Sequence, residues 1–397
     1  MKIAVIGGGP AGLVAAGSAI GAEVVLFEHT DKVGKKIYIT GKGRCNFTNV
    51  CDNQTFLQNV VRNAPFLRSA LSKFSPFDAV DFLENLGCKT KVERGRRAFP
   101  LSDKASDVTK ALKAYAENNG AEIRLDSNVT DIVSNNGGFT VTIGGKKEKF
   151  DKVIVCTGGK SYPVTGSDGS MYKVVERLGH TVNKPTPSLV ELYTKQDLSA
   201  AEGLTLKNVS LSCDGVKPIF GDLMITEKGI SGPIALTLSA INALAIPYSV
   251  RLDLKPALGE DELDSRLLRD FGLAPNKQFK NALDLLLPKS IIPFIIYASG
   301  IGEERRINSI TKKERWDICK LIKNFELDVT GNAGFDRAVV TCGGVDVKQV
   351  DPKTMQSRLV PGLYFGGEIL DVDALTGGYN FHIALATGYV AGSSATE

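Results

Sequence analysis

The sequence predicts an α/β protein: a parallel β-sheet covered by helices, interrupted by an inserted domain of β-barrel and helices. Three observations predict it. A strand, a glycine turn, a helix and a second strand open the chain within residues 2–28. A strand, glycine turns and a helix close it within residues 363–391. Between about residues 187 and 341 the glycine clusters stop, and strand-like segments precede helical ones.

The length predicts how these parts are divided. A chain of 397 residues corresponds to two or three domains at roughly 100–200 residues each. We expect a sheet domain, a β-barrel and a helical insertion, with the two ends of the chain joining in the first. The expected boundaries are residues 1–187 with 341–397, residues 188–255 with 325–340, and residues 256–324.

The opening segment has the order of a Rossmann-type dinucleotide site. The apolar run Lys2–Ile6 leads into the sequence GGGPAG (Gly7–Gly12), and a second strand, Glu23–Phe27, ends at Glu28. In this GxGxxG pattern the first glycine permits a tight turn, the second lets a pyrophosphate approach the backbone, and the third lets helix and strand pack closely. The start of the helix offers free N–H groups and a partial positive charge to the pyrophosphate. Glu28 can accept hydrogen bonds from ribose hydroxyls, which favours FAD or NAD over NADP.

Later glycine clusters favour FAD of these two. The loop Gly41–Asn49 follows Lys36, the cluster Thr157–Gly159 ends a buried strand, and Glu368 ends another strand before a glycine turn opens a helix near Phe381. Two strand–glycine–acid sites more than 300 residues apart suit a long ligand. We therefore expect FAD to be held at its adenosine end by residues 7–28 and at its flavin end by residues 368–381. The alternative is that these clusters are only glycine turns between strands.

Six segments spread over nearly the whole chain carry a resemblance to a known family. They are GGGPAG (7–12), GKGRCNFTN (41–49), GRRAFPLSDKASDV (95–108), CTGGKSYPVTGSDG (156–169), GISGP (229–233) and GLYFGGEILDVDALTGGYNFHIA (362–384). The sequence resembles the bacterial aminoacetone-oxidase-like FAD-dependent oxidoreductases, the group that includes a 3-dehydro-bile-acid 4,6-reductase. The resemblance implies the two-dinucleotide-binding type of flavoprotein. It also implies FAD contacts at Ala11, Glu28, Lys36, Arg44, Val129, Glu368, Asn380 and Phe381.

The residue patterns and the resemblance together define an expected cofactor site. Its members are Gly7, Gly9, Pro10, Ala11, Gly12, Glu28, Lys36, Gly43, Arg44, Cys45, Asn46, Val129, Thr157, Gly158, Gly159, Glu368, Gly378, Tyr379, Asn380 and Phe381. Two positions depart from the family pattern: Glu227 stands before GISGP, where the family often has histidine, and His382 stands where it often has glutamine. If either position touches substrate, the chemistry of the family need not transfer intact.

Periodicity predicts the remaining elements. Residues 103–119 read as an amphipathic helix, residues 129–133 as a short strand and residues 131–150 as a strand hairpin. The resemblance implies that this region forms a three-stranded meander. In the insertion, residues 189–193, 204–213, 218–226 and 248–254 read as strands, and residues 260–271, 276–287 and 312–324 as helices.

No catalytic acid or base can be assigned from the sequence. Tyr379, His382 and Cys45 are weak candidates because they lie near the expected flavin ring, although packing explains each of them equally well. Of the other two histidines, His29 is expected to be exposed and His180 to lie at the surface. Arg94, Arg96 and Arg97 can bind an anionic substrate or reductant, or form a solvated basic loop.

Composition restricts the function classes. The formal net charge is only +4, which disfavours a dedicated nucleic-acid binder. Seven scattered cysteines without a CxxC pair predict neither a zinc site nor a disulfide framework, and so no bound metal. We expect a cytoplasmic protein without signal peptide or membrane span, with a small-molecule substrate and no stable nucleic-acid partner. The oligomeric state is left open.

The sequence therefore predicts an FAD-dependent oxidoreductase. The leading hypothesis passes hydride from NADH or NADPH, a transient co-substrate, through flavin N5 to a conjugated double bond of an apolar, steroid-like enone. The alternative is a flavin oxidase of a small amine or aminoketone that uses oxygen. An RNA-associated flavoprotein is a further alternative, as is a flavin-binding regulator without turnover.

Overall fold

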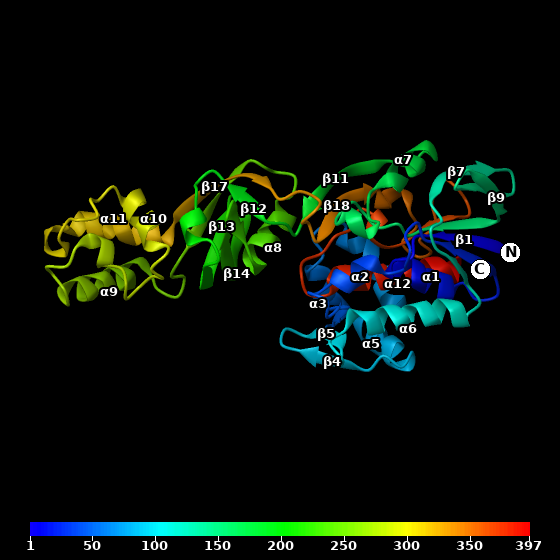
Figure 1. Ribbon diagram of the computed structural model, residues 1–397, viewed down its shortest axis with the longest axis horizontal. Helices are drawn as coiled ribbons and strands as arrows, with labels where there is room; N and C mark the ends of the chain where they lie inside the picture. The colour runs from blue at the N-terminus through cyan, green and yellow to red at the C-terminus, as the bar shows by residue number, and fades with distance from the viewer. The chain divides into compact units, whose positions relative to one another are not determined.

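The computed structural model describes all 397 residues, which form two compact units (Figure 1). The first comprises Met1–Ser188 together with Phe335–Glu397, and the second comprises Leu189–Gly334. The chain therefore leaves the first unit once, forms the second, and returns.

The first unit is built on a five-stranded parallel sheet with the strand order β19-β10-β1-β2-β6. The strands are β1 (Lys2–Ile6), β2 (Glu23–Phe27), β6 (Glu122–Arg124), β10 (Lys152–Val155) and β19 (Leu363–Phe365). The central strands are almost wholly apolar because helices or loops cover both faces of the sheet. The strand order reverses between β1 and β10, as it does in a Rossmann fold, and this confirms the predicted fold class.

Two helices from opposite ends of the chain pack tightly beside this sheet. They are α1 (Pro10–Ser18) and α12 (Tyr379–Ser394), which lie next to each other in Figure 1. A Cβ atom at Gly388 would lie 2.3 Å from the Ala11 carbonyl oxygen, so only glycine permits this approach. The amino-terminal and carboxy-terminal motifs are therefore brought together by helix packing.

Smaller elements complete the first unit. The meander has the predicted three strands, and a second small antiparallel sheet joins β3, β5 and β4. The elements are α2 (Lys35–Ile39), β3 (Thr48–Asn49), α3 (Asn53–Gln58), α4 (Arg68–Lys73), α5 (Pro76–Asn85), β4 (Thr90–Glu93), β5 (Arg97–Pro100), α6 (Ala105–Asn118), β7 (Val129–Asn135), β8 (Gly138–Ile143), β9 (Lys146–Phe150), α7 (Ser170–Arg177), β11 (Val182–Ser188) and β18 (Val340–Val345).

The second unit contains a closed six-stranded barrel and four helices, as the predicted fold class requires. The strands are β12 (Leu192–Thr194), β13 (Thr205–Cys213), β14 (Val216–Thr226), β15 (Gly229–Ser231), β16 (Tyr248–Asp253) and β17 (Phe325–Asn332), and the helices are α8 (Pro233–Ile241), α9 (Glu260–Gly272), α10 (Ile292–Ser299) and α11 (Lys312–Lys323). The barrel and these helices share one apolar core. The finer division of this unit into two domains stays a prediction.

Two local expectations were wrong. The predicted helix over residues 276–287 contains only a 3₁₀ turn, Phe279–Asn281, because Gln278 is extended and bridges to Arg306, and irregular turns follow. The helix begins later, at Ile292, where Pro293 occupies its first turn and so initiates rather than breaks it. His180 is not at the surface: it is 3% exposed and its Nε2 lies 2.7 Å from Ser357 Oγ.

Candidate cofactor site

One long cavity lies in the first unit, at the carboxyl ends of β1 and β10. Its empty space, including the part open to solvent, is about 1220 Å³. Ligands bind at this edge in open α/β sheets because the strand order reverses there. Twelve of the twenty residues expected at the cofactor line this cavity: Gly7, Gly9, Pro10, Ala11, Glu28, Lys36, Val129, Thr157, Gly158, Glu368, Asn380 and Phe381.

The amino-terminal glycine turn forms one wall. A Cβ atom at Gly9 would meet no protein atom within 4 Å, so this part of the backbone faces open space. At Gly12, by contrast, a Cβ atom would lie 1.8 Å from the Gly7 carbonyl oxygen. The turn therefore uses one glycine to pack and another to expose its backbone, as a pyrophosphate site requires.

Glu28 is fixed at one end of the cavity. It is 8% exposed, and its two carboxylate oxygens accept hydrogen bonds from Gly8 N–H and Thr30 N–H, both at 2.8 Å. These bonds hold the carboxylate in place and leave further lone pairs for a ligand. Val129, the first residue of β7, lines the same cavity.

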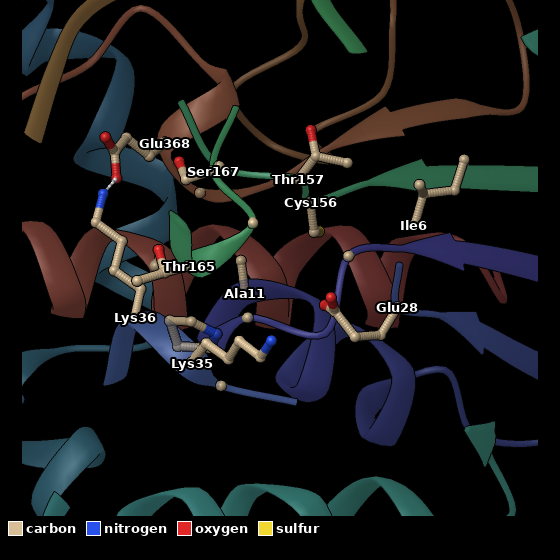
Figure 2. Close-up of a pocket in the computed structure, with 18 of the residues that line it drawn as sticks. Ile6, Ala11, Glu28, Lys35, Lys36, Cys156, Thr157, Thr165, Ser167 and Glu368 are labelled. Atoms are coloured by element: carbon tan, nitrogen blue, oxygen red, sulfur yellow. Dashed lines mark hydrogen bonds and ion pairs between the residues drawn. The ribbon is translucent and has the colours of Figure 1, made fainter. Parts of the chain in front are cut away.

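A partly buried polar network surrounds Glu368, and Figure 2 shows its pair with Lys36 on the opposite side of Ala11 from Glu28. Lys36 Nζ donates to Glu368 Oε2 at 2.8 Å and to Ser161 Oγ at 2.6 Å. Glu368 Oε1 accepts from Ser161 Oγ and from Thr341 N–H, both at 2.8 Å. Four segments far apart in the sequence are thereby tied together beside the cavity.

The loop that follows β10 supplies a third wall. Thr165, Ser167 and Asp168 line the cavity together with the first turn of α7. Ser167 is 6% exposed, and its hydroxyl has no hydrogen-bond partner in the protein. A buried hydroxyl without a partner is costly, so this group is available to a ligand.

The amino terminus of α12 meets the cavity at Asn380 and Phe381. Gly378 precedes the helix at φ +99°, and no side chain caps the free N–H groups of its first turn. Such a terminus stabilises negative charge. The side chain of Asn380 is already engaged, because it donates to the Ala374 carbonyl at 2.6 Å and accepts from Ala374 N–H at 2.9 Å.

The other eight residues of the expected site do not line the cavity: Gly12, Gly43, Arg44, Cys45, Asn46, Gly159, Gly378 and Tyr379. Arg44 instead pairs with Glu93 and with Asp103, and stacks over Phe99 with 4.3 Å from its Cζ to the ring centroid.

Two of the glycines among these eight have packing roles, and Asn46 is buried beside one of them. Gly159 and Gly378 allow close packing, since a Cβ atom there would lie 2.5 Å from Thr341 Oγ1 and from the Thr48 carbonyl oxygen respectively. Asn46 has a buried amide oxygen without a partner, next to Gly378.

The three weak catalytic candidates lie in the core. Burial raises the pKa of the Cys45 thiol, and raises that of Tyr379 to about 12. The ring of His382 donates from Nε2 to the Phe74 carbonyl and accepts at Nδ1 from Thr48 Oγ1, both at 3.1 Å. Burial lowers the pKa of His382 to about 4, so the ring is neutral near pH 7. The other departure from the family pattern, Glu227, is exposed in the second unit.

Sequence reasoning missed several residues of the cavity. His29 is exposed as expected yet lines it, close to Gly166. The TGSDG loop belongs to one of the segments that carry the family resemblance, but nothing in its spacing shows that Ser167 faces a ligand. The residues not expected are Ile6, Phe27, His29, Gly34, Lys35, Thr40, Ser127, Asn128, Cys156, Thr165, Gly166, Ser167, Asp168, Ser170, Met171, Val339, Val340, Gly367 and Ala384.

These features fit FAD. The cavity offers an open glycine turn at the start of a helix, the buried carboxylate of Glu28, and the unpartnered hydroxyl of Ser167 in its lining. No group of three or more His, Cys, Asp or Glu side chains is placed to hold a metal ion. No helix is both long and apolar enough to span a bilayer.

Residues 1–394 match the family model described as the HI0933-like protein Rossmann domain. The chain belongs to the HI0933-like family. It is an enzyme, an FAD-dependent oxidoreductase.

Two characterised relatives that are similar in sequence to this HI0933-like chain have different names. It is 31% identical to the 3-dehydro-bile acid delta(4,6)-reductase of Clostridium scindens, over all of this chain and 99% of that protein. It is 32% identical to the ribosomal RNA dihydrouridine synthase of Haemophilus influenzae, over 97% of this chain and 96% of that protein. Among solved structures it resembles the 3-ketosteroid-delta4-(5alpha)-dehydrogenase of Rhodococcus jostii RHA1, with a TM-score of 0.55, 15% identity, and coverage of 100% of this chain and 97% of that one. At this identity the structural likeness shows the fold alone.

Proposed function

We propose that this protein reduces a carbon–carbon double bond conjugated to a carbonyl group, with hydride supplied by NADH or NADPH by way of FAD. The observation that carries this proposal is the single cavity joining the GxGxxG turn to the start of α12. Its length and its lining suit one extended dinucleotide whose redox ring lies at the α12 end.

The cofactor assignment rests on the cavity lining. We assign the adenosine end to Glu28 and Val129, the pyrophosphate to the backbone at Gly9 and the start of α1, and the flavin end to Glu368 and the start of α12. When bound, the flavin supplies hydride transfer, and the protein orients substrate and manages protons. The free N–H groups of the first turn of α12 would stabilise negative charge on a bound flavin ring.

The reaction class is supported by the chemistry that the two relatives' names share. A 3-dehydro-Δ4,6 compound has its double bonds conjugated to a ketone, and dihydrouridine differs from uridine by saturation of the bond conjugated to the C4 carbonyl. Both names therefore describe hydride addition to an unsaturated carbonyl compound. This favours a reductase over an oxidase of a small amine.

Two substrate classes remain, and each has support. An apolar steroid-like enone is our first candidate, supported by the full-length similarity to the bile-acid reductase. A uracil base in ribosomal RNA is the second, supported by equal similarity to a dihydrouridine synthase. No catalytic acid is assigned, because Tyr379, His382 and Cys45 all lie outside the cavity.

One comparison of the two substrates tests the proposal. The FAD-loaded protein, with NADPH or NADH under anaerobic conditions, is offered a 3-oxo-4,6-diene steroid or ribosomal RNA from a strain lacking the corresponding synthase. We expect loss of the dienone absorbance or formation of dihydrouridine detected by mass spectrometry. Failure with both, together with oxygen-dependent oxidation of an amine, would contradict the reductase assignment.

A further inference from the structure

A cluster of basic side chains lies on the hairpin formed by β4 and β5 and on the loop beside it. The cluster comprises Lys42, Arg44, Lys89, Lys91, Arg94, Arg96, Arg97 and Lys104, and we call it the cationic hairpin surface. The loop lies beside the hairpin, since Arg44 pairs with Glu93 of β4, and it contacts the start of α6, where Ala105 N–H donates to the Gly43 carbonyl at 2.9 Å. The guanidinium groups of both Arg44 and Arg97 make cation–π contacts with the ring of Phe99.

Most of these charges are not neutralised within the protein. Arg44 and Lys91 share the two acids of these segments, Glu93 and Asp103. The other six basic side chains are exposed and form no ion pair: Lys42, Lys89, Arg94, Arg96, Arg97 and Lys104.

The local charge differs from that of the whole chain. Residues 41–45 and 89–104 contain eight Lys and Arg against two Asp and Glu, an excess of six. Since the net charge of the protein is only +4, the rest of the chain is slightly acidic. The small net charge therefore conceals a local field of the kind that attracts polyanions.

The hairpin turn is joined to the flavin end of the cavity. The side-chain amide of Asn49 donates to the Gly95 carbonyl in this turn, at 2.9 Å, and to the Gly377 carbonyl, at 3.3 Å. Gly377 lies two residues before α12, whose first turn reaches the cavity at Asn380 and Phe381. A chain bound along the hairpin would thus pass close to the place we assign to the flavin.

We infer that the cationic hairpin surface binds the phosphate backbone of an RNA substrate, beside the site where its base is reduced. This inference rests on the proposed function, and of the two substrate classes it concerns the uracil base in ribosomal RNA. Three arginines within four residues favour phosphate, because the guanidinium fork matches its oxygens. Contacts of this kind position a nucleic acid without reading its sequence.

The inference is tested with the FAD-loaded protein and a fluorescein-labelled oligouridine of twelve nucleotides. The variant is Arg94→Gln/Arg96→Gln/Arg97→Gln, and the matched control is Lys146→Gln/Lys147→Gln/Lys149→Gln, which removes three exposed cations from the strand β9. We expect the arginine variant to lose at least tenfold in affinity near 0.15 M KCl. The slope of log affinity against log salt should fall in magnitude by about 2, which corresponds to three phosphate contacts on a single strand. The control should bind like the unchanged protein.

Three outcomes would overturn the inference: no RNA binding by the unchanged protein, equal losses in both variants, or undiminished RNA binding by the arginine variant. The same variant is also measured on phosphatidylglycerol vesicles, since Val92 and Leu101 are exposed nearby. Loss of vesicle binding with undiminished RNA binding would assign the surface to lipid instead. Flavin bleaching by NADPH and steroid reduction are followed in parallel. If these persist without RNA binding, only the inference fails, whereas absent bleaching contradicts the proposed function itself.

Discussion

At the scale of the residue, the glycines of the first turn have separable roles. Spacing alone predicted that one glycine packs and another faces the cofactor, because the GxGxxG pattern imposes both tasks. The structure gives them different surroundings: crowding around Gly12 and open space at Gly9.

Substitution of these two glycines should therefore affect different properties: FAD affinity at Gly9 and stability at Gly12. Gly9→Ala fits the apoprotein, since Gly9 has φ −76° and an open Cβ position, but places a methyl group where the pyrophosphate would lie. We expect an unchanged melting temperature without FAD and a dissociation constant for FAD raised about tenfold or more. Gly12→Ala should lower the free energy of unfolding of the apoprotein by about 1–3 kcal/mol, and with it the melting temperature, because the added methyl group overpacks the turn. Equal loss of stability in both variants would contradict this assignment.

Ser167 could not be predicted from the sequence, because only the folded loop shows that its hydroxyl lacks a partner. Ser167→Ala should weaken FAD binding about three- to tenfold, the typical net value of one hydrogen bond, without destabilising the apoprotein. Ser72→Ala is the control, since Ser72 lies outside the cavity and its Oγ already donates to the Ser69 carbonyl at 2.8 Å. Fluorescence titration with FAD measures both, and unaltered affinity in Ser167→Ala would remove this residue from the site.

His382 should affect stability rather than catalysis. Its pKa falls from 6.5 to about 4 on folding, so below pH 6.5 the unfolded chain binds a proton that the folded one does not. The stabilisation by the neutral ring is complete above pH 6.5 and is lost as the pH falls towards 4, amounting to roughly 3 kcal/mol at most. His382→Gln should flatten this part of the curve of unfolding free energy against pH. If the unfolding free energy of His382→Gln fell between pH 6.5 and pH 4 as it does in the unchanged protein, the His382 ring would not be buried in its neutral form.

At the scale of the element, the sequence predicted what depends on local pattern. The central strands, the meander and α6 follow from apolar runs and periodicity within single segments. The region of residues 276–287 was mistaken for a helix because its extended part is fixed by pairing with Arg306, a partner that local periodicity does not contain. The buried position of His180 likewise depends on Ser357, 177 residues away.

The start of α12 combines a structural and a binding role. Asn380→Ala removes two hydrogen bonds to the main chain of Ala374, so we expect a loss of about 1–3 kcal/mol of stability as well as lower FAD content. Glu28→Ala is the comparison variant at the other end of the cavity, where FAD content should also fall. Thermal melting with and without FAD separates the two effects. Full yellow colour in both purified variants would contradict the placement of the two ends.

At the scale of the whole molecule, the decisive feature is that the first and last helices pack together. The sequence predicted two half-sites more than 300 residues apart, and the glycines of α12 let its backbone touch that of α1. The extent of the cavity could also be anticipated from these half-sites. Its third wall, the loop after β10, could not, since the spacing of small residues does not reveal which way a loop folds.

Net charge was the least informative property at this scale. A value of +4 disfavoured a dedicated nucleic-acid binder, yet six basic side chains without an ion-pair partner lie on the β4–β5 hairpin and the segments beside it. Total charge averages over surfaces that act separately, because screening confines each to about 8–10 Å at physiological salt.

The most direct test of the account is an anaerobic experiment on the purified yellow protein. Its flavin absorbance is followed after mixing with NADH or NADPH, and again after addition of a conjugated enone or ribosomal RNA in the absence of oxygen. We expect rapid bleaching by at least one nicotinamide nucleotide and recovery of the yellow colour by the unsaturated substrate. A colourless protein that cannot be reconstituted with FAD, or bleaching by an amine with recovery only in air, would contradict it.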